Sequence, residues 1–318
     1  MSKQMITARP VEIRDAQITS STAPFPDTGE TILTATSYAV GDTGSYLMSD
    51  GVYHKVECKS AVTVNFSTAA TLPEPWPDDE NNSYWIDLGF ANKFAPFQRE
   101  RNTQNSTASP YVVAVDPGER FTAIAINNIL ADSVQLDVYD SSAVLIKTET
   151  RQLLARSVYS VRDWIYQSHR QVTRTLFTNL PAVSTNTFKL TFTRAAGNVQ
   201  VGNIMPGVAL EIGIPQLKGK LRKENFTVFT RDEFGESKIT KRRNVPEIEL
   251  TLIQKKNRLN GINDIVNDLN GEVTFWAAVT ETTDGYFESL MIIGVYKEYG
   301  SSIDYPDYVT TNLEIEGL

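Results

Sequence analysis

The stretch of sequence that decides the fold begins with Ser37-Tyr38-Ala39-Val40-Gly41-Asp42 and ends with Tyr84-Trp85-Ile86-Asp87-Leu88-Gly89. Asp50-Gly51 lies between them and is typical of a two-residue β-hairpin turn, because both residue types tolerate positive φ. Tyr46 and Tyr53 flank this turn, so we expect them to pair across the two strands. Three prolines then favour extended backbone up to Trp85 (Pro73, Pro75 and Pro77). The stretch predicts a small β module whose core is made of aromatic side chains.

This stretch resembles the small carbohydrate-binding modules appended to chitinases, in which a Tyr-x-x-Gly-Asp start leads to a closing Trp. It also resembles the version of that module in bacteriophage tail proteins, where the closing Trp is followed by Asp-Leu-Gly and an Asn-(Lys/Arg)-(Phe/Trp) step. Here that run continues after Trp85 to Phe90-Ala91-Asn92-Lys93-Phe94. The resemblance extends loosely to the end of the chain, through Arg231-Asp232-Glu233-Phe234-Gly235 and Glu316-Gly317-Leu318.

The resemblance implies a structural protein of a bacteriophage virion tail, neck or tail appendage. Such a protein is made in the host cytoplasm, resides in the virion and assembles with other virion proteins, as a homo-oligomer in the particle. Its module would face partners or host cell-surface glycans. The alternatives are a free carbohydrate-binding protein and a glycan-processing enzyme.

Length and composition set bounds on these readings. The chain has 318 residues, enough for two or three domains, and a net charge of -8, which argues against a dedicated nucleic-acid binder. Its single cysteine, Cys58, excludes an internal disulfide framework and is expected to be half-buried on a strand. We expect no secretory signal after Met1 and no membrane span, since no apolar run approaches about 18 residues.

The pattern along the chain predicts a mainly β protein. We expect an extended N-terminal arm, a carbohydrate-binding-module-like β domain, a linker, an antiparallel jelly-roll-like β sandwich, and a β sheet with one α-helix that serves in docking. Apolar residues three and four apart place that helix at about 254–269, whereas 151–167 is ambiguous between helix and irregular structure. The predicted boundaries are 1–31, 32–97, 98–110, 111–215 and 216–318.

We find no motif that predicts catalysis, a metal or a cofactor. The two histidines, His54 and His169, are isolated from each other in sequence, and no Gly-x-Ser-x-Gly, phosphate-loop or dinucleotide-binding pattern occurs. The run Asp78-Asp79-Glu80 lacks the spacing of a calcium loop and reads as a solvated acidic loop. We therefore expect a protein that is not an enzyme.

Aromatic and basic residues are the candidates for function. Sugars and partners stack on exposed rings, so the candidate contact residues are Trp76, Tyr46, Tyr53 and Trp85. For the last three, a place in the module's core is the main alternative, whereas Trp76 stands between two prolines on a long loop. The candidate assembly residues are Lys218, Lys220, Arg222, Arg242 and Arg243. An acidic stretch follows them, so either both faces are simply solvated or the basic face of one copy meets the acidic face of another.

Overall fold

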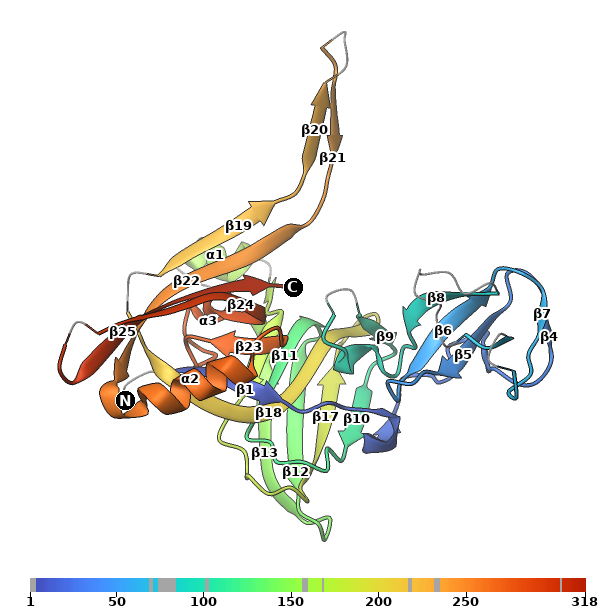
Figure 1. The fold of residues 1–318 in the computed structure, drawn as a ribbon, viewed down its shortest axis with the longest axis horizontal. Helices are drawn as coiled ribbons and strands as arrows, with labels where there is room; N and C mark the ends of the chain where they lie inside the picture. The colour runs from blue at the N-terminus through green and yellow to red at the C-terminus, as the bar shows by residue number, and fades with distance from the viewer. Residues whose placement is uncertain are drawn as a thin grey trace. The chain divides into compact units, whose positions relative to one another are not determined.

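The computed structural model describes residues 4–68, 71–73, 84–100, 103–155, 160–167, 169–216, 219–231, 235–303 and 305–318. It is mainly β, as the sequence predicts (Figure 1). The chain forms two compact units. We call residues 11–175 and 179–206 the sandwich unit, and residues 1–10, 176–178 and 207–318 the sheet-and-helix unit. The described helices include none long and apolar enough to cross a membrane.

The sandwich unit is built on a five-stranded antiparallel sheet. Its order is β13 (Leu145–Gln152), β12 (Ser133–Tyr139), β17 (Thr187–Thr193), β10 (Tyr111–Val115) and β2 (Ile18–Ser21). Burial alternates along β10 and β17, as expected for strands with one face on a core. The other strands are β11 (Ala123–Leu130), β16 (Arg174–Phe177), β9 (Asn105–Thr107) and the first part of β18 (Val199–Pro215). Phe121 meets Phe188 edge-on in the core.

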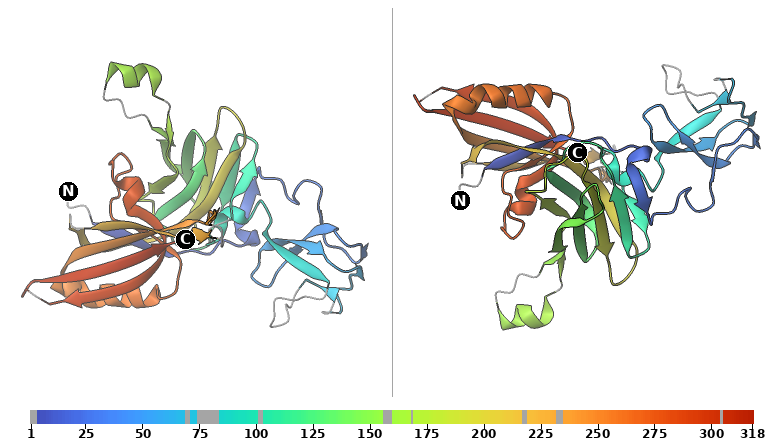
Figure 2. Two further views of the ribbon diagram at one scale, coloured as in Figure 1. Left: turned by 90° about the horizontal axis from the view of Figure 1, so that it is seen from above. Right: turned by 90° about the horizontal axis from the view of Figure 1, so that it is seen from below.

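Two segments of this unit differ from expectation. Residues 105–107, expected to be linker, form β9 and pair with β18 at Val199–Val201. Asn105 is buried, and its Oδ1 accepts from Val201 N at 2.9 Å, which supports this pairing. The ambiguous segment contains β14 (Leu154–Ala155), which pairs with β15 (Arg170–Gln171), and the short helix α1 (Val161–Tyr166) (Figure 2).

The aromatic module lies within the sandwich unit. Its sheet has the order β3 (Thr31–Ile32), β5 (Thr43–Leu47), β6 (Tyr53–Cys58) and β8 (Trp85–Phe90), and β4 (Ser37–Tyr38) pairs with β7 (Val62–Thr63). The expected pairing of Tyr46 with Tyr53 is wrong by one residue: Tyr46 faces His54, and Leu47 faces Tyr53. The turn spans 48–52, because Met48 N donates to Val52 O and Asp50 Oδ1 accepts from Val52 N.

The sheet-and-helix unit contains a sheet in the order β18, β1 (Met5–Pro10), β23 (Thr274–Ala277), β24 (Met291–Ser302), β25 (Tyr308–Gly317), β22 (Asn244–Lys255) and β19 (Lys220–Asn225). It closes on itself, since Ile214 and Pro215 of β18 also pair with β22. The segment expected to be an extended arm therefore supplies an interior strand: Met5, Thr7 and Ala8 have no exposed surface.

Helix α2 (Leu259–Asp268) covers one face of this sheet. Ile262 and Val266 are buried on the cluster formed by the strands, which includes Ile212, Leu252 and Trp276. The helix begins five residues later than predicted, because β22 runs on to Lys255 and a 3-10 turn follows (Lys256–Arg258). The unit also has a short helix α3 (Phe287–Leu290).

We expect Gly294→Ala to destabilise the sheet-and-helix unit. A Cβ at Gly294 would lie 1.9 Å from the backbone oxygen of Glu316 and 2.8 Å from Cα of Gly317, so two strands would have to separate. The free energy of unfolding should fall by about 1–3 kcal/mol, the usual cost of overpacking. Gly300→Ala on the same strand is the control, since its Cβ meets nothing within 4 Å. Equal urea midpoints for the two variants would contradict this assignment.

Candidate functional site

The aromatic residues proposed as ligand contacts have different surroundings. Trp85 is 1% exposed, and its Nε1 donates to Thr71 O at 3.0 Å. Tyr38 meets its ring edge-on at 5.4 Å. Tyr46 is half-buried and packs against the same cluster. Trp85 therefore has no ring face open to a sugar and serves as the centre of the module's core. Trp76 lies outside the described residues.

Tyr53 belongs to a second aromatic group, away from Trp85. It stacks on Phe94 at 5.7 Å and meets Phe25 edge-on at 4.8 Å. Lys93 Nζ lies 4.8 Å from the centroid of Phe94, a cation–π contact, and also 3.2 Å from Asp15 Oδ1. Tyr53 thus contributes to holding the segments around Phe25 and Phe94 together, with only part of its ring exposed.

His54 is the centre of a polar cluster in the module. Its Nδ1 lies 2.9 Å from Asp87 Oδ2 and its Nε2 lies 3.1 Å from Asp50 Oδ2. Both ring nitrogens can donate only in the imidazolium form. Burial lowers the pKa of His54, but the bonds to the two carboxylates outweigh burial and raise it above its ordinary value of 6.5. The cluster joins the hairpin turn to β8.

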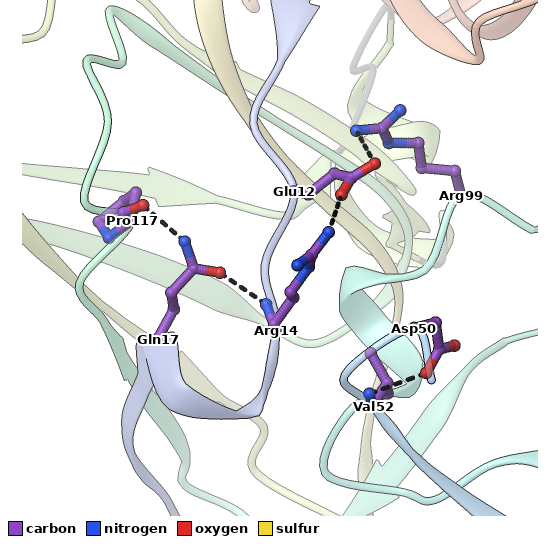
Figure 3. A network of polar contacts seen from close by, with 7 residues as sticks. All are labelled: Glu12, Arg14, Gln17, Asp50, Val52, Arg99 and Pro117. Carbon is purple, nitrogen blue, oxygen red and sulfur yellow. Dashed lines mark hydrogen bonds and ion pairs between the residues drawn. The ribbon is translucent and has the colours of Figure 1, made fainter. Parts of the chain in front are cut away.

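Figure 3 shows a network of polar contacts in the sandwich unit. Glu12, Arg14 and Arg99 of this network help to line a hollow of about 270 Å³. Glu12 accepts from Arg14 at 3.2 Å and lies 3.8 Å from an Arg99 nitrogen. Gln17 donates to Pro117 O at 2.6 Å and accepts from Arg14 N at 2.7 Å. These contacts fix the segment between β1 and β2, which is a structural role.

A larger hollow of about 670 Å³ lies at one end of the sandwich, between the turns near Asp116 and Asp140. The carboxylates of both residues accept from backbone N–H groups of their own turns, at Gly118 and at Ser142 and Val144. Their position is thus explained by turn formation.

In the described part of the chain, no group of three or more histidine, cysteine or acidic side chains is arranged so that it could hold a metal ion. Cys58 is fully buried rather than half-buried, and burial raises the pKa of its thiol, which disfavours the thiolate. His169 follows the C-terminal end of α1 and is exposed.

The strongest candidate site is a two-stranded projection that we call the hairpin arm, residues 219–243. It consists of β19, β20 (Val228–Arg231), β21 (Ser237–Thr240) and the residues leading into β22. β20 pairs only with β21, and Figure 1 shows the two strands projecting beyond β19 and β22. Every described residue of the arm from 220 to 243 is exposed or half-exposed.

The arm presents an apolar face that the sequence analysis missed. Phe229 and Ile239 are register partners, so their side chains lie on the same face of the ribbon. They are 67% and 61% exposed. Phe226 and Leu221 add further exposed apolar surface along the arm. The available signal was the apolar content of 226–231, which reads Phe-Thr-Val-Phe-Thr-Arg, but the basic residues on either side drew the attention instead.

Of the predicted assembly residues, Lys220 and Arg222 lie on β19, which we call the root of the arm. Arg242 and Arg243 lie where the arm returns to the sheet. Lys220 Nζ contacts both carboxylate oxygens of Glu249 at 3.0 Å, and an Arg222 nitrogen lies 3.6 Å from that residue. Arg242 and Arg243 lie between β21 and β22, and the described residues include no ion-pair partner for either. Lys218 lies outside the described residues. The structure thus gathers Lys220, Arg222, Arg242 and Arg243 on one arm.

A second exposed apolar element is α1. Val161, Trp164, Ile165 and Tyr166 are all more than half exposed, and they occupy four of its six positions. The sequence left this segment ambiguous between helix and irregular structure and did not indicate that its apolar residues are exposed.

We expect Trp85→Ala to destabilise the module by about 3–5 kcal/mol, the usual cost of removing a buried Trp side chain. The neighbouring variant Ile86→Ala is the control, because Ile86 is 44% exposed. Hydrogen exchange of the backbone amides in β6 and β8 measures the loss of stability within the module. If Trp85→Ala left that exchange unchanged and altered only binding of a ligand, the core assignment would be wrong.

The His54 cluster predicts a pH-dependent stability of the module. A raised pKa means that the folded state binds the proton more tightly than the unfolded state does. The contribution is complete below pH 6.5 and is lost as the pH rises through the folded-state value. We expect a loss of about 0.5–1 kcal/mol, the size of a partly exposed ion pair. His54→Gln should abolish this pH step, whereas His169→Gln should retain it; a step that survives in His54→Gln rejects the assignment.

Comparison with known proteins adds little to this geometry. No family model and no curated protein matches the chain. Among solved structures, the chain is similar to a selenomethionine-labelled point mutant of chitosan-binding module 1, derived from a chitosanase/glucanase of Paenibacillus sp. IK-5. The two are 12% identical, with a TM-score of 0.25, over 36% of this chain and 82% of that chain. A likeness this weak carries no argument about function.

Proposed function

We propose that the chain is a structural subunit of a bacteriophage virion tail that assembles with neighbouring proteins through the hairpin arm. The observation that carries the assembly role is the exposed pair Phe229 and Ile239 on an isolated two-stranded ribbon. The virion context is supported by the sequence resemblance of the Trp85–Phe94 run to tail-protein modules.

The physical argument concerns the stability of the arm. A two-stranded ribbon is marginally stable alone in water, because neither face is covered. Burying a Phe or Ile side chain contributes about 1.5–3 kcal/mol, which the arm forgoes while Phe229 and Ile239 remain in solvent. Exposed apolar side chains framed by polar ones are the arrangement of an interface. The arm's own positive charge keeps it soluble before it docks.

The alternative functions have less support. A free carbohydrate-binding protein or a glycan-processing enzyme needs an open ring platform or a catalytic cleft. The candidate platform that remains is Trp76, outside the described residues, since Trp85 is buried and Tyr53 is engaged with Phe94. We therefore include contact with host glycans only as a secondary part of the proposal.

The virion role is tested on particles. We expect mass spectrometry of gradient-purified virions from a culture that carries the gene to find this chain at a fixed ratio to other tail proteins. Antibody labelling should place it on the tail. Its absence from intact particles would refute the proposal.

The role of the arm is tested by substitution of its apolar face. We expect Phe229→Ser with Ile239→Ser to leave the fold intact, because both side chains are exposed, and to abolish incorporation into particles. Ile303→Ser with Tyr305→Ser is the matched control, since these residues are 73% and 63% exposed on another part of the same unit. Normal incorporation of the arm variant would contradict a docking role.

A further inference from the structure

The hairpin arm and the remainder of the chain carry opposite charge. Residues 219–243 include eight Lys and Arg against four Asp and Glu, a net charge of +4. The rest of the chain has 22 against 34 and carries −12. Two arms therefore repel each other, whereas the arm of one copy is attracted to the body of another. This asymmetry excludes arm-to-arm pairing as the favoured contact.

One surface of the sheet-and-helix unit concentrates this negative charge. We call it the glutamate face, and it lies on the outer side of β22, β25 and β24, opposite the residues that pack under α2. Cross-strand partners here are acidic: Glu247 faces Glu316, Glu249 faces Glu314, and Glu314 faces Glu298. Like charges directly opposite each other destabilise a sheet. A cation between them removes this cost.

The glutamate face already binds cationic side chains of its own chain. Lys297 Nζ lies 2.6 Å from Glu247 Oε1 and 3.0 Å from Glu316 Oε2, so one ammonium group bridges two strands. Hydrogen bonds from Lys297 lower the pKa of Glu247. Lys220 and Arg222 contact Glu249 from the root of the arm. The carboxylates of this face are thus accessible to cationic side chains.

The cations and carboxylates left over are complementary. Within the described residues, no cation pairs with Glu298 or Glu314, and the neighbouring group of Glu314 is the carboxyl of Glu247, to which its side chain is hydrogen-bonded. The basic residues of the arm without an ion pair are Lys223 on β19 and, on the outer arm beyond β19, Arg231, Lys238, Lys241, Arg242 and Arg243. The outer arm projects away from its own sheet (Figure 1). Its cations are thus placed to meet the glutamates of a second copy.

From these observations we propose that the hairpin arm docks on the glutamate face of a second copy of this chain. Phe229 and Ile239 form the apolar centre of the contact, and Arg242 and Arg243 pair with Glu298 and Glu314. This inference rests on the proposed assembly function and names its partner. The two surfaces differ, so the association is head-to-tail, and it closes into a ring or grows as a filament.

Charge reversal of the full chain tests the proposal by sedimentation velocity. We expect the wild type to self-associate at about 0.1 M salt, where the Debye length is ~10 Å, and to dissociate towards monomer at about 1 M, where it is ~3 Å. Arg242→Glu with Arg243→Glu should weaken association at least about tenfold, and so should Glu298→Lys with Glu314→Lys, because each places like charges in contact. The chain that carries all four substitutions should associate again.

The control is Lys255→Glu with Lys256→Glu, which changes the net charge equally at exposed positions outside the arm. It should associate like the wild type. A wild type that is monomeric at both salt concentrations overturns the proposal, and so does a four-substitution chain that stays monomeric while the wild type associates. Sedimentation measures self-association of the purified chain, whereas mass spectrometry of virions measures particle composition, so the two results are independent. A monomeric chain that is found in virions would therefore overturn this inference and leave the proposed function standing.

Discussion

The sheet-and-helix unit depends on the insertion of β1 between β18 and β23. Residues 5–10 are separated from their partners by some two hundred residues and more of sequence, yet they lie in the interior of the sheet. Thr7 Oγ1 donates to Phe275 O at 3.0 Å, and Thr274 Oγ1 donates to Ala8 O at 2.5 Å. These buried hydroxyl groups are satisfied only when both strands are in register. The register of β1 in turn brings Met5 into the cluster beneath α2.

The hairpin arm follows from the same closed sheet. β22 is bound to β25 along nine residue pairs, from Glu247 with Glu316 to Lys255 with Tyr308, and this ladder fixes its direction. β19 pairs with the first part of β22, and the chain between them extends as β20 and β21 beyond the last residue pair of that ladder. β22 is twelve residues long, so its ladders with β25 and β19 anchor the base of the arm in the sheet. Phe229 and Ile239 are held opposite each other by the pairing of β20 with β21, without a core beneath them.

Sequence patterns were sufficient where the constraint was local. The three-and-four spacing in α2 predicted the helix, because this element buries one face. The hairpin in the module was predicted, but its register was not, because the turn closes through Met48 and Val52 rather than through Asp50-Gly51 alone. β1 was missed as a sheet strand, since its burial on both faces removes alternation and its partners are distant in sequence. For the candidate site, the basic residues could be named, but the exposure of Phe229 and Ile239 depends on the absence of a covering layer, which no local pattern reveals.

The placement of β1 has a consequence for the order in which the chain folds during synthesis. The sandwich unit is, in sequence, an insertion within the sheet-and-helix unit, because residues 1–10 precede it and residues 207–318 follow it. β1 leaves the ribosome before the sandwich segments, whereas β18 and β23, the strands between which it lies, emerge only after them. Met5, Ile6 and Ala8 therefore have no sheet to enter until the sandwich segments have been synthesised. β1 is buried later than segments that follow it in the chain, and chaperone binding during that interval would fall on its apolar residues.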